Sequence, residues 1–566
     1  MAKLIQICTR STEIKGFETK VKTLFNRLLP SDISPRPPLI RSSDHLYIGI
    51  LNPSPTLTFS GDSVCLGKMF AASDGWAIPG NETPDGNFAL FRNTHTKTEV
   101  ITDILGSRTV WYYFDEERLI VSTSQRCIVY FLESFEPNPE VYSWFISSGT
   151  LGPELSWDRR IRYLPGNSRL KLDRLNWKLE IETTPVNFTL GDYREADIPE
   201  IYENALRETL GNIHLNHDHW SLLLSGGYDS RGLCYFLPFT QDMKGISWGK
   251  PSSIRAKNTD PFIAAQIAQK QGIDFRFLPI KNSAGHFEEM ISRFLINGEG
   301  RSDKISGYMD LFATWKSIFE SNVYGLIRGD HTFDYRPSAN AFETRYNYYL
   351  LTLNDYTGLK DWGKFNLPDQ VIPEKFVQLR TESFAEWGGR LDRMFYFPMI
   401  QAALADLKLG YVEKTNPYIN RRLMDIQGSL PVNAHLGKAV FKDIIRKKYP
   451  EIPFATTQAL TTEENFTTQP KVARYICENL RNPDSTSVFS SQMKNLIADS
   501  ITQSLEKSSF DFFQKIKKTL KKRIPNSLKK SIKKPFYKTE PDFPLIGFRI
   551  VLIEKMHQLL CEDARY

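Results

Sequence analysis

A short apolar run that ends in a glycine-rich loop constrains this chain more than any other feature. The run spans Trp220–Leu224, the loop SGGYDS occupies 225–230, and residues 231–237 have a helical pattern. Glycine lets a backbone approach an anion without a Cβ in the way. Backbone N–H groups at a helix start, together with serine hydroxyls, hold phosphate oxygens. The segment therefore predicts a strand, loop and helix that bind a nucleotide through its pyrophosphate.

Asp229 within this loop needs a cation between its carboxylate and the phosphates. A Mg²⁺ ion that bridges Asp229 and pyrophosphate meets that need. The loop lacks the GxxxxGK[ST] pattern of a Walker loop, so it does not predict transfer of a γ-phosphate. An ordinary glycine turn is the alternative interpretation.

The pattern along the chain divides it into regions of different type. Short runs of β-branched and aromatic residues recur up to about residue 185, including the alternating stretch 170–181, which predicts a hairpin. From about residue 195, predicted strands at 220–224, 243–248 and 275–279 alternate with helices. Alternation of this kind indicates a parallel sheet that binds ligands at the carboxyl ends of its strands. Residues 340–510 have a mostly helical pattern.

The C-terminal region, residues 511–566, is expected to be a basic amphipathic extension. Lysine and arginine dominate 515–538, and apolar residues recur there every four positions from Ile516 to Ile532, with Pro525 as an interruption. One interpretation is a solvated helix or tail. The other is contact with an acidic partner, a precursor peptide or anionic lipid.

Composition excludes several classes of protein. The 566 residues correspond to about two to four domains, and the net charge of +7 does not indicate a nucleic-acid binder. The six cysteines form no CxxC pair, which argues against zinc and disulfide frameworks. No apolar run reaches the roughly 18 residues of a spanning helix, and the N-terminus does not match a signal peptide. We expect a soluble cytoplasmic protein, for which a homodimer is one possible assembly.

The loop SGGYDS resembles the pyrophosphate loop of the asparagine synthetase family, which includes β-lactam synthetases and lasso-peptide macrolactam cyclases. Further segments resemble family motifs in the same order. They are ISWG at 246–249, DPFIAAQIA at 260–268, RGDHTF at 328–333, LGYVEKTNPYIN at 409–420 and GKAVFKDIIR at 437–446. In the N-terminal half, DGNFALF at 85–91 and TDILGSRTVWYYF at 102–114 resemble the family's glutaminase domain.

This resemblance implies a fold and a domain division. An α+β, Ntn-type glutaminase-like domain is expected over residues 1–190. An α/β PP-loop ATP-pyrophosphatase domain of the adenine-nucleotide α-hydrolase type, with a helical C-terminal part, is expected over 191–510. The implied activity is adenylation of a carboxylate, with release of pyrophosphate, followed by attack of an amine.

The resemblance also implies cofactors and site residues. ATP and Mg²⁺ are the expected cofactors, with Asp229 and Asp330 as the metal ligands. Glu413 is placed near the acyl substrate, and Lys442, or alternatively Lys438, supplies the cation that stabilises the transition state and the leaving pyrophosphate. Contacts to ATP are expected from Leu224, Ser225, Gly226, Gly227, Asp229, Ser230, Ser247 and Gly329.

Two departures from the family pattern bear on the source of the amine. A working glutaminase uses the cysteine freed by removal of Met1, whereas Ala2 stands here and the first cysteine is Cys8. Ile327 also lies near the place where typical members carry a glutamate. Glutamine hydrolysis is therefore expected to be lost, and the amine is free ammonia or an amino group of the substrate.

Four functions remain open. The first is a macrolactam-forming ligase of the lasso-cyclase type, and the second is an asparagine-synthetase-like ligase that joins ammonia to an amino acid or other carboxylate. The third is a nucleotide-binding scaffold without catalysis, and the fourth is a PP-loop enzyme that modifies tRNA. The residues considered for selection of a small-molecule or peptide carboxylate are Glu299, Arg301, Asp303 and Tyr308.

Overall fold

The structure is a computed structural model. It describes residues 3–71, 74–238, 242–280, 286–330, 333–359, 362, 365–457, 466–482, 487–510 and 539–566. Ala2 and the basic stretch 515–538 lie outside the described residues.

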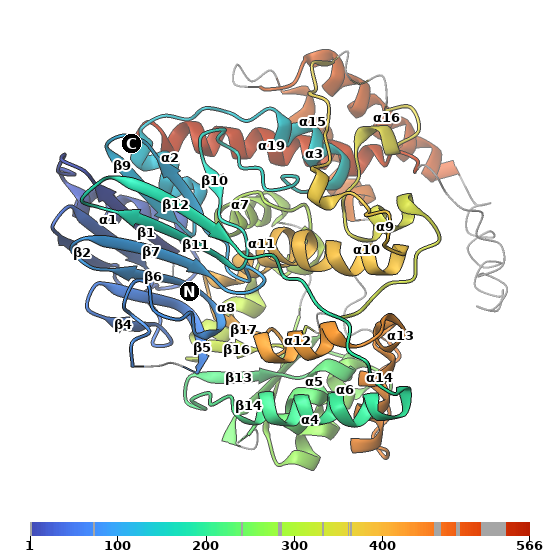
Figure 1. The fold of residues 1–566 in the computed structure, drawn as a ribbon. Coiled ribbons are helices and arrows are strands. Elements are labelled where there is room, and N and C mark those ends of the chain that lie inside the picture. The colour runs from blue at the N-terminus through green and yellow to red at the C-terminus, as the bar shows by residue number, and fades with distance from the viewer. Residues whose placement is uncertain are drawn as a thin grey trace.

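Two antiparallel six-stranded sheets make up the N-terminal half (Figure 1). The first has the order β10 (Arg162–Tyr163), β8 (Trp111–Phe114), β9 (Arg118–Ser122), β1 (Lys3–Thr9), β3 (Leu46–Leu51), β2 (Leu39–Ser43). The second has the order β12 (Lys178–Thr183), β11 (Ser168–Asp173), β7 (Lys97–Thr102), β6 (Asp85–Asn93), β5 (Ser63–Ala71), β4 (Thr58–Ser60). Strands β11 and β12 confirm the predicted hairpin and pair from Ser168↔Thr183 to Asp173↔Lys178.

The two sheets stack because each places one apolar face against the other. Ile48 and Val121 of the first sheet share a buried cluster with Leu66, Phe91 and Leu170 of the second. Strand β11 alternates buried and half-buried residues along its length, as expected when one face of a sheet is covered. Stacked sheets of this kind form a core about 10 Å thick.

A five-stranded parallel sheet organises the second half. Its order is β15 (Asp274–Pro279), β14 (Lys244–Gly249), β13 (Trp220–Leu223), β16 (Gly325–Ile327), β17 (Glu413–Thr415). The pairing is parallel throughout, which confirms the predicted sheet type. Strands β13, β14 and β15 confirm the three predicted strands.

Helices pack on both faces of the parallel sheet, as is usual for a sheet of this type. Helices α4, α5, α6 and α14 pack on one face, together with Leu222 of β13. On the other face, Ile246, Leu278 and Leu326 join a large core that includes α7 and α8.

The helices are α1 (Phe17–Leu28), α2 (Gln125–Leu132), α3 (Glu140–Ser148), α4 (Ile198–Gly211), α5 (Tyr228–Phe236), α6 (Asp260–Gln271), α7 (Phe287–Gly298), α8 (Ala313–Glu320), α9 (Ala341–Asn347), α10 (Phe384–Leu391), a π-helix (Asp392–Gln401), α11 (Ala402–Leu409), α12 (Arg421–Ser429), α13 (Val432–His435), α14 (Ala439–Lys448), α15 (Pro470–Arg481), α16 (Ser491–Phe510) and α19 (Phe543–Asp563).

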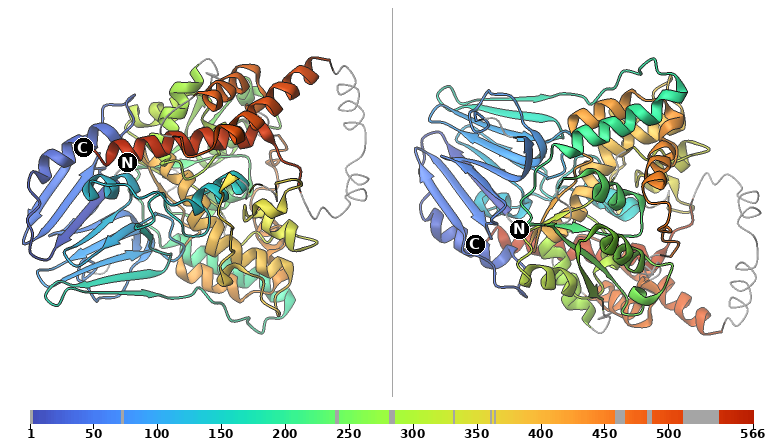
Figure 2. Two further views of the ribbon diagram at one scale, coloured as in Figure 1. Left: turned by 90° about the horizontal axis from the view of Figure 1, so that it is seen from above. Right: turned by 90° about the horizontal axis from the view of Figure 1, so that it is seen from below.

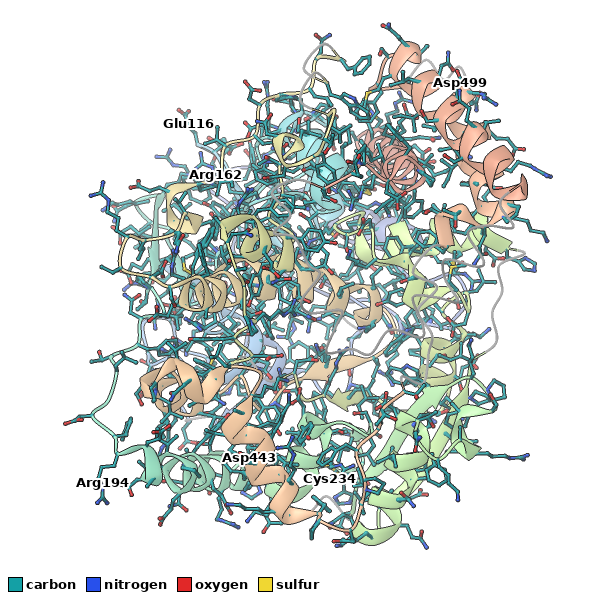
Figure 3. All side chains as sticks on the ribbon, turned by 90° about the vertical axis from the view of Figure 1, so that its right-hand side faces the viewer. Glu116, Arg162, Arg194, Cys234, Asp443 and Asp499 are labelled. Carbon is teal, nitrogen blue, oxygen red and sulfur yellow. The ribbon has the colours of Figure 1, made fainter. Side chains whose placement is uncertain are left out.

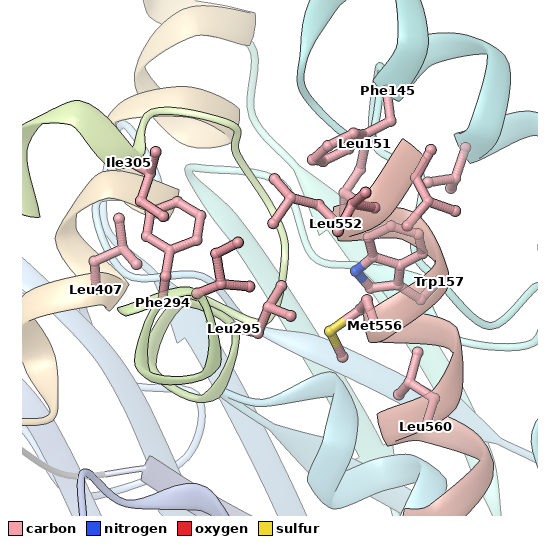
Figure 4. Packing of buried hydrophobic residues seen from close by; sticks show 14 of the residues in the cluster. Phe145, Leu151, Trp157, Phe294, Leu295, Ile305, Leu407, Leu552, Met556 and Leu560 are labelled. Atoms are coloured by element: carbon pink, nitrogen blue, oxygen red, sulfur yellow. The ribbon is translucent and has the colours of Figure 1, made fainter. Parts of the chain in front are cut away.

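The C-terminal helix α19 is part of the core. It runs back along the molecule so that the C-terminus ends beside the N-terminal sheets (Figure 2). Leu552, Met556 and Leu560 pack near Trp157 (Figure 4), and all four side chains are buried. At its end, the fully buried Asp563 lies 2.5 Å from Arg126 Nε. Residues 543–563 of the range assigned to a basic extension therefore form a buried helix.

Side chains fill the space between these elements (Figure 3). Cys234 is buried in the parallel-sheet half, whereas Asp443 of α14 and Asp499 of α16 are exposed. None of the helices in the described ranges is both long and apolar enough to cross a membrane.

Candidate functional site

A cavity of ≈ 580 Å³ opens at the carboxyl ends of β13, β14 and β16. The ends of parallel strands meet at one edge of a sheet, so this is where ligands bind in folds of this class. The lining residues are Leu223, Leu224, Ser225, Gly227, Tyr228, Asp229, Ser230, Ser247, Trp248, Asp260, Arg328, Gly329, Asp330, Asp334, Lys438 and Lys442.

The predicted loop leads from β13 into α5, which begins at Tyr228. Its two serines lie together, with 3.0 Å between the Oγ atoms of Ser225 and Ser230. The Gly227 N–H donates to Ser225 Oγ at 3.2 Å. A Cβ at Gly226 would lie 2.5 Å from Ala455 Cβ, so this position requires glycine. The strand–loop–helix arrangement is confirmed.

Two carboxylates from different loops face this cavity. Asp229 stands in the first turn of α5, and Asp330 follows β16. Between them lies Gly329, where a Cβ would be 3.1 Å from the Asp229 carbonyl oxygen and 2.9 Å from Tyr418 Cε2. The absence of a side chain at Gly329 therefore allows the two acidic loops to approach.

Both carboxylates have cationic partners. Lys438 Nζ lies 2.7 Å from Asp229 Oδ2. Asp330 accepts from Arg328 Nε at 2.9 Å and from Lys414 Nζ at 3.2 Å. Although burial alone would raise the pKa of Asp330, Arg328 and Lys414 hold that pKa well below its usual range. The two cations therefore favour the ionised carboxylate of Asp330, which is the form that a metal ligand requires.

The donor set fits magnesium bound together with phosphates. Within the described ranges, no group of three or more His, Cys, Asp or Glu side chains is placed to hold a metal. Mg²⁺ is usually held by one or two carboxylates, with waters and phosphate oxygens as its other ligands. Asp229 and Asp330 match that number beside a loop with hydroxyls and glycines.

Two lysines of the segment 437–446, Lys438 and Lys442, line the cavity that Asp229 and Asp330 face. Lys438 precedes α14 with a left-handed backbone, φ 59°, and its carbonyl accepts from the Lys442 N–H at 2.9 Å. Lys442 Nζ lies 5.5 Å from the centre of the Tyr228 ring. Residues four apart lie on the same side of a helix. The structure therefore brings both candidate lysines to the cavity, where Lys438 contacts Asp229 and Lys442 lies beside Tyr228.

Most predicted nucleotide contacts line the cavity; Gly226 does not, and its N–H donates to Asp260 Oδ1 at 3.0 Å. Sequence reasoning did not assign roles to Arg328, Trp248 or Asp334, which also line it. Arg328 and Trp248 each neighbour a predicted contact in sequence, and that adjacency was the available signal.

Glu413 lies outside this cavity. It begins β17, is 1% exposed, and pairs with Arg108 Nη1 of the N-terminal half at 2.7 Å. These two residues line a second, small cavity of ≈ 30 Å³ between the halves, together with Asn87 and Asn416. Burial opposes ionisation of Glu413, but Arg108 holds its pKa below the usual value.

The residues considered for substrate selection are buried structural groups. Glu299 accepts from Lys3 Nζ at 2.8 Å, and Asp303 accepts from Arg549 Nε at 2.8 Å. Arg301 pairs with Asp406, and Tyr308 is 4% exposed. None of the four is among the residues that line the cavity at Asp229.

Comparison with known proteins gives little. No protein-family model matches this chain, and no curated protein matches it. A structure of the allosteric regulatory enzyme of purine biosynthesis aligns with a TM-score of 0.22 and 8% identity, covering 50% of this chain and 82% of the other. Glutamine phosphoribosylpyrophosphate amidotransferase from B. subtilis, complexed with ADP and GMP, aligns with 0.20 and 12% identity, covering 50% and 68%. At these TM-scores, the likeness carries no argument about fold or function.

Proposed function

We propose that this protein is an ATP-dependent ligase that adenylates a substrate carboxylate and joins the acyl group to an amine. The observation that carries the proposal is that Asp229 and Asp330 face one cavity beside the SGGYDS loop, with Lys438 and Lys442 on its wall. Under this proposal, residues 191–510 act as a PP-loop synthetase domain.

The proposal assigns each group a task. The hydroxyls of Ser225 and Ser230 and the N–H groups at the start of α5 bind pyrophosphate oxygens, and Asp229 and Asp330 would hold magnesium. Bound magnesium supplies positive charge to the phosphates. Lys442 and Lys438 stabilise the charge that develops on pyrophosphate as the substrate carboxylate displaces it from the α-phosphorus. An amine then attacks the acyl-adenylate, and AMP leaves.

The state of Cys8 supports an amine source other than glutamine. Its thiol is buried and lies 3.3 Å from Thr98 Oγ1, and burial raises its pKa. A buried thiol of this kind is a poor nucleophile. Ile327, near the position where a glutamate was expected from the resemblance, is an apolar residue fully buried in β16 and offers no carboxylate for an ammonium ion. The buried thiol argues against glutamine as the amine source, and we propose that the amine belongs to the acyl substrate, as in a macrolactam-forming ligase.

The test uses pyrophosphate exchange and product mass. Purified protein with Mg²⁺ and ATP is incubated with linear peptides that carry an internal Asp or Glu and a free α-amine. Expected products are AMP, pyrophosphate and a peptide that has lost one water, with no such product from N-acetylated peptides. Aspartate with ammonium is the parallel substrate, and conversion of that pair alone would replace macrolactam formation by an asparagine-synthetase-like reaction.

Two variants make this test specific. Asp229→Ala should abolish exchange, whereas Asp443→Ala on the exposed side of α14 should leave it unchanged. Release of ADP in place of AMP, or no exchange with any carboxylate offered, would contradict the proposed function.

A further inference from the structure

One short segment holds both acidic loops of the cavity. Asn416 Oδ1 accepts from the Asp330 N–H at 3.3 Å, and Asn416 Nδ2 donates to the Asp330 carbonyl at 2.8 Å. Two residues later, Tyr418 OH donates to the Asp229 carbonyl at 2.9 Å. The backbone positions of Asp229 and Asp330 therefore depend on where residues 414–418 lie.

That segment is fixed by a residue of the N-terminal half. Asn87 of β6 accepts at Oδ1 from Asn416 N at 2.7 Å and from Thr415 Oγ1 at 2.8 Å. Its Nδ2 donates to the Ile419 carbonyl at 3.1 Å. The side chain of Asn87 thus forms hydrogen bonds with three residues of the segment that carries Asn416: Thr415, Asn416 and Ile419.

The hydrogen bonds of Asn87 to this segment are buried, which makes their loss costly. Asn87 is 4% exposed, Thr415 1% and Asn416 3%. Hydrogen bonds in such an environment are strong, and removal of one partner leaves the other unsatisfied. Because Asn87 satisfies a backbone N–H and a carbonyl at once, its loss frees the segment to shift.

We propose that Asn87 is a positioning residue for the nucleotide site, and that the N-terminal half serves as a clamp which sets Asp330 through Asn416. The role of Asp330 as a metal ligand rests on the proposed function above. In this arrangement, the N-terminal half contributes to the second half's chemistry independently of any glutamine hydrolysis, because the site is incomplete without the strand that carries Asn87.

The same strand offers a matched control. Asn93 also belongs to β6, and its side chain makes hydrogen bonds within the N-terminal half: with Gln6 at 2.9 and 3.0 Å, with Thr98 Oγ1 at 2.9 Å and with the Asp62 carbonyl at 3.0 Å. Asn93→Ala therefore removes a comparable number of partly buried hydrogen bonds without touching residues 414–418.

The test measures binding as well as turnover. ATP affinity of the full chain is determined by calorimetry over a range of Mg²⁺ concentrations, with melting temperature as the measure of folding. Asn87→Ala should weaken Mg²⁺-dependent ATP binding by about 10-fold or more. Asn93→Ala should lower the melting temperature similarly while binding stays within about 2-fold of the wild type.

Two further variants keep the test decisive. Thr415→Val removes one donor to Asn87 and should give a smaller shift in the same direction, which covers the case in which Asn87→Ala does not fold. Asn87→Ala combined with Asn416→Ala should bind no more weakly than Asn416→Ala alone, because both act through one chain of contacts.

The outcomes separate this inference from the proposed function. Failure of the wild-type protein to bind ATP in the presence of Mg²⁺ would contradict the proposed function. Wild-type binding, together with an Asn87→Ala variant whose ATP affinity equals that of Asn93→Ala, would overturn the clamp alone.

Discussion

The ammonium of Lys438 lies 2.7 Å from Oδ2 and 3.0 Å from Oδ1 of Asp229. It reaches that position from a left-handed backbone, φ 59°, which L-residues other than Asn and Asp seldom adopt. Lys438 therefore occupies the coordination sphere of Asp229 that a divalent cation would need.

Removal of this lysine should separate metal binding from turnover. In Lys438→Met, the ammonium of residue 438 no longer competes with a metal ion for Asp229, so Mg²⁺ affinity without nucleotide should rise by about 10-fold. Pyrophosphate exchange should fall by about 10²-fold or more, because a cation is lost from the transition state. Calorimetric titration with MgCl₂ and an exchange assay measure the two effects.

Lys442→Met is the comparison variant, because Lys442 packs on Tyr228. This variant should lower pyrophosphate exchange without a change in Mg²⁺ affinity. Equal affinity in Lys438→Met and wild type would contradict this competition.

A methyl group at Gly329 should force the acidic loops apart. A Cβ there would approach the Asp229 carbonyl oxygen to 3.1 Å and Tyr418 Cε2 to 2.9 Å. Gly329→Ala should cost about 1–3 kcal/mol of unfolding free energy and weaken ATP binding. Gly307→Ala, where a Cβ meets nothing within 4 Å, is the matched control and should be nearly neutral. Urea denaturation and ATP calorimetry give both values, and wild-type ATP affinity in Gly329→Ala would show that the close approach is unnecessary.

The buried pair of Arg108 and Glu413 should matter for stability more than for chemistry. Glu413→Gln leaves the Arg108 charge buried without its carboxylate, so it should destabilise the fold by about 3–5 kcal/mol. Arg108→Met combined with Glu413→Met should recover most of that loss, because neither charge is then buried. Urea denaturation measures stability, and pyrophosphate exchange in the double variant measures function. A Glu413→Gln protein of wild-type stability that is inactive would instead place Glu413 at the acyl substrate.

Local patterns in the sequence predicted the elements whose cause is local. Strand β13, its loop and α5 follow from an apolar run, two glycines and a helical pattern within 220–237, and the alternation at 170–181 gave the β11–β12 hairpin. Strand β17 was not predicted, because Glu-Lys-Thr at 413–415 has no apolar periodicity and is held by pairing with β16.

Contacts between residues that are distant in the sequence could not be predicted, because no local pattern marks them. Asn87 and Asn416 are 329 positions apart, and neither stands in a pattern that marks it as a partner of the other. For α19, the lysine-rich stretch upstream dominated the prediction for 511–566, whereas the apolar sequence of Phe543–Asp563 packs in the core. Burial of that helix depends on surfaces that exist only after both halves have folded.

The last prediction concerns the effect of pH on the carboxyl group of Asp85. This group accepts a hydrogen bond of 2.9 Å from the backbone N–H of Arg421, at the start of α12. Burial raises the pKa of Asp85 to about 6, above its ordinary value of 3.8. A carboxyl group with a raised folded-state pKa holds its proton more tightly when folded, so its contribution to stability is complete below pH 4 and is lost as pH rises toward 6. Asp85→Asn keeps the acceptor oxygen and removes this loss. Its unfolding free energy relative to wild type should therefore increase by about 1–3 kcal/mol between pH 4 and pH 7. Urea denaturation of both proteins at the two pH values checks this, with the pH 4 pair as internal control; a difference that is the same at both values would show that Asp85 ionises alike in the folded and unfolded chain.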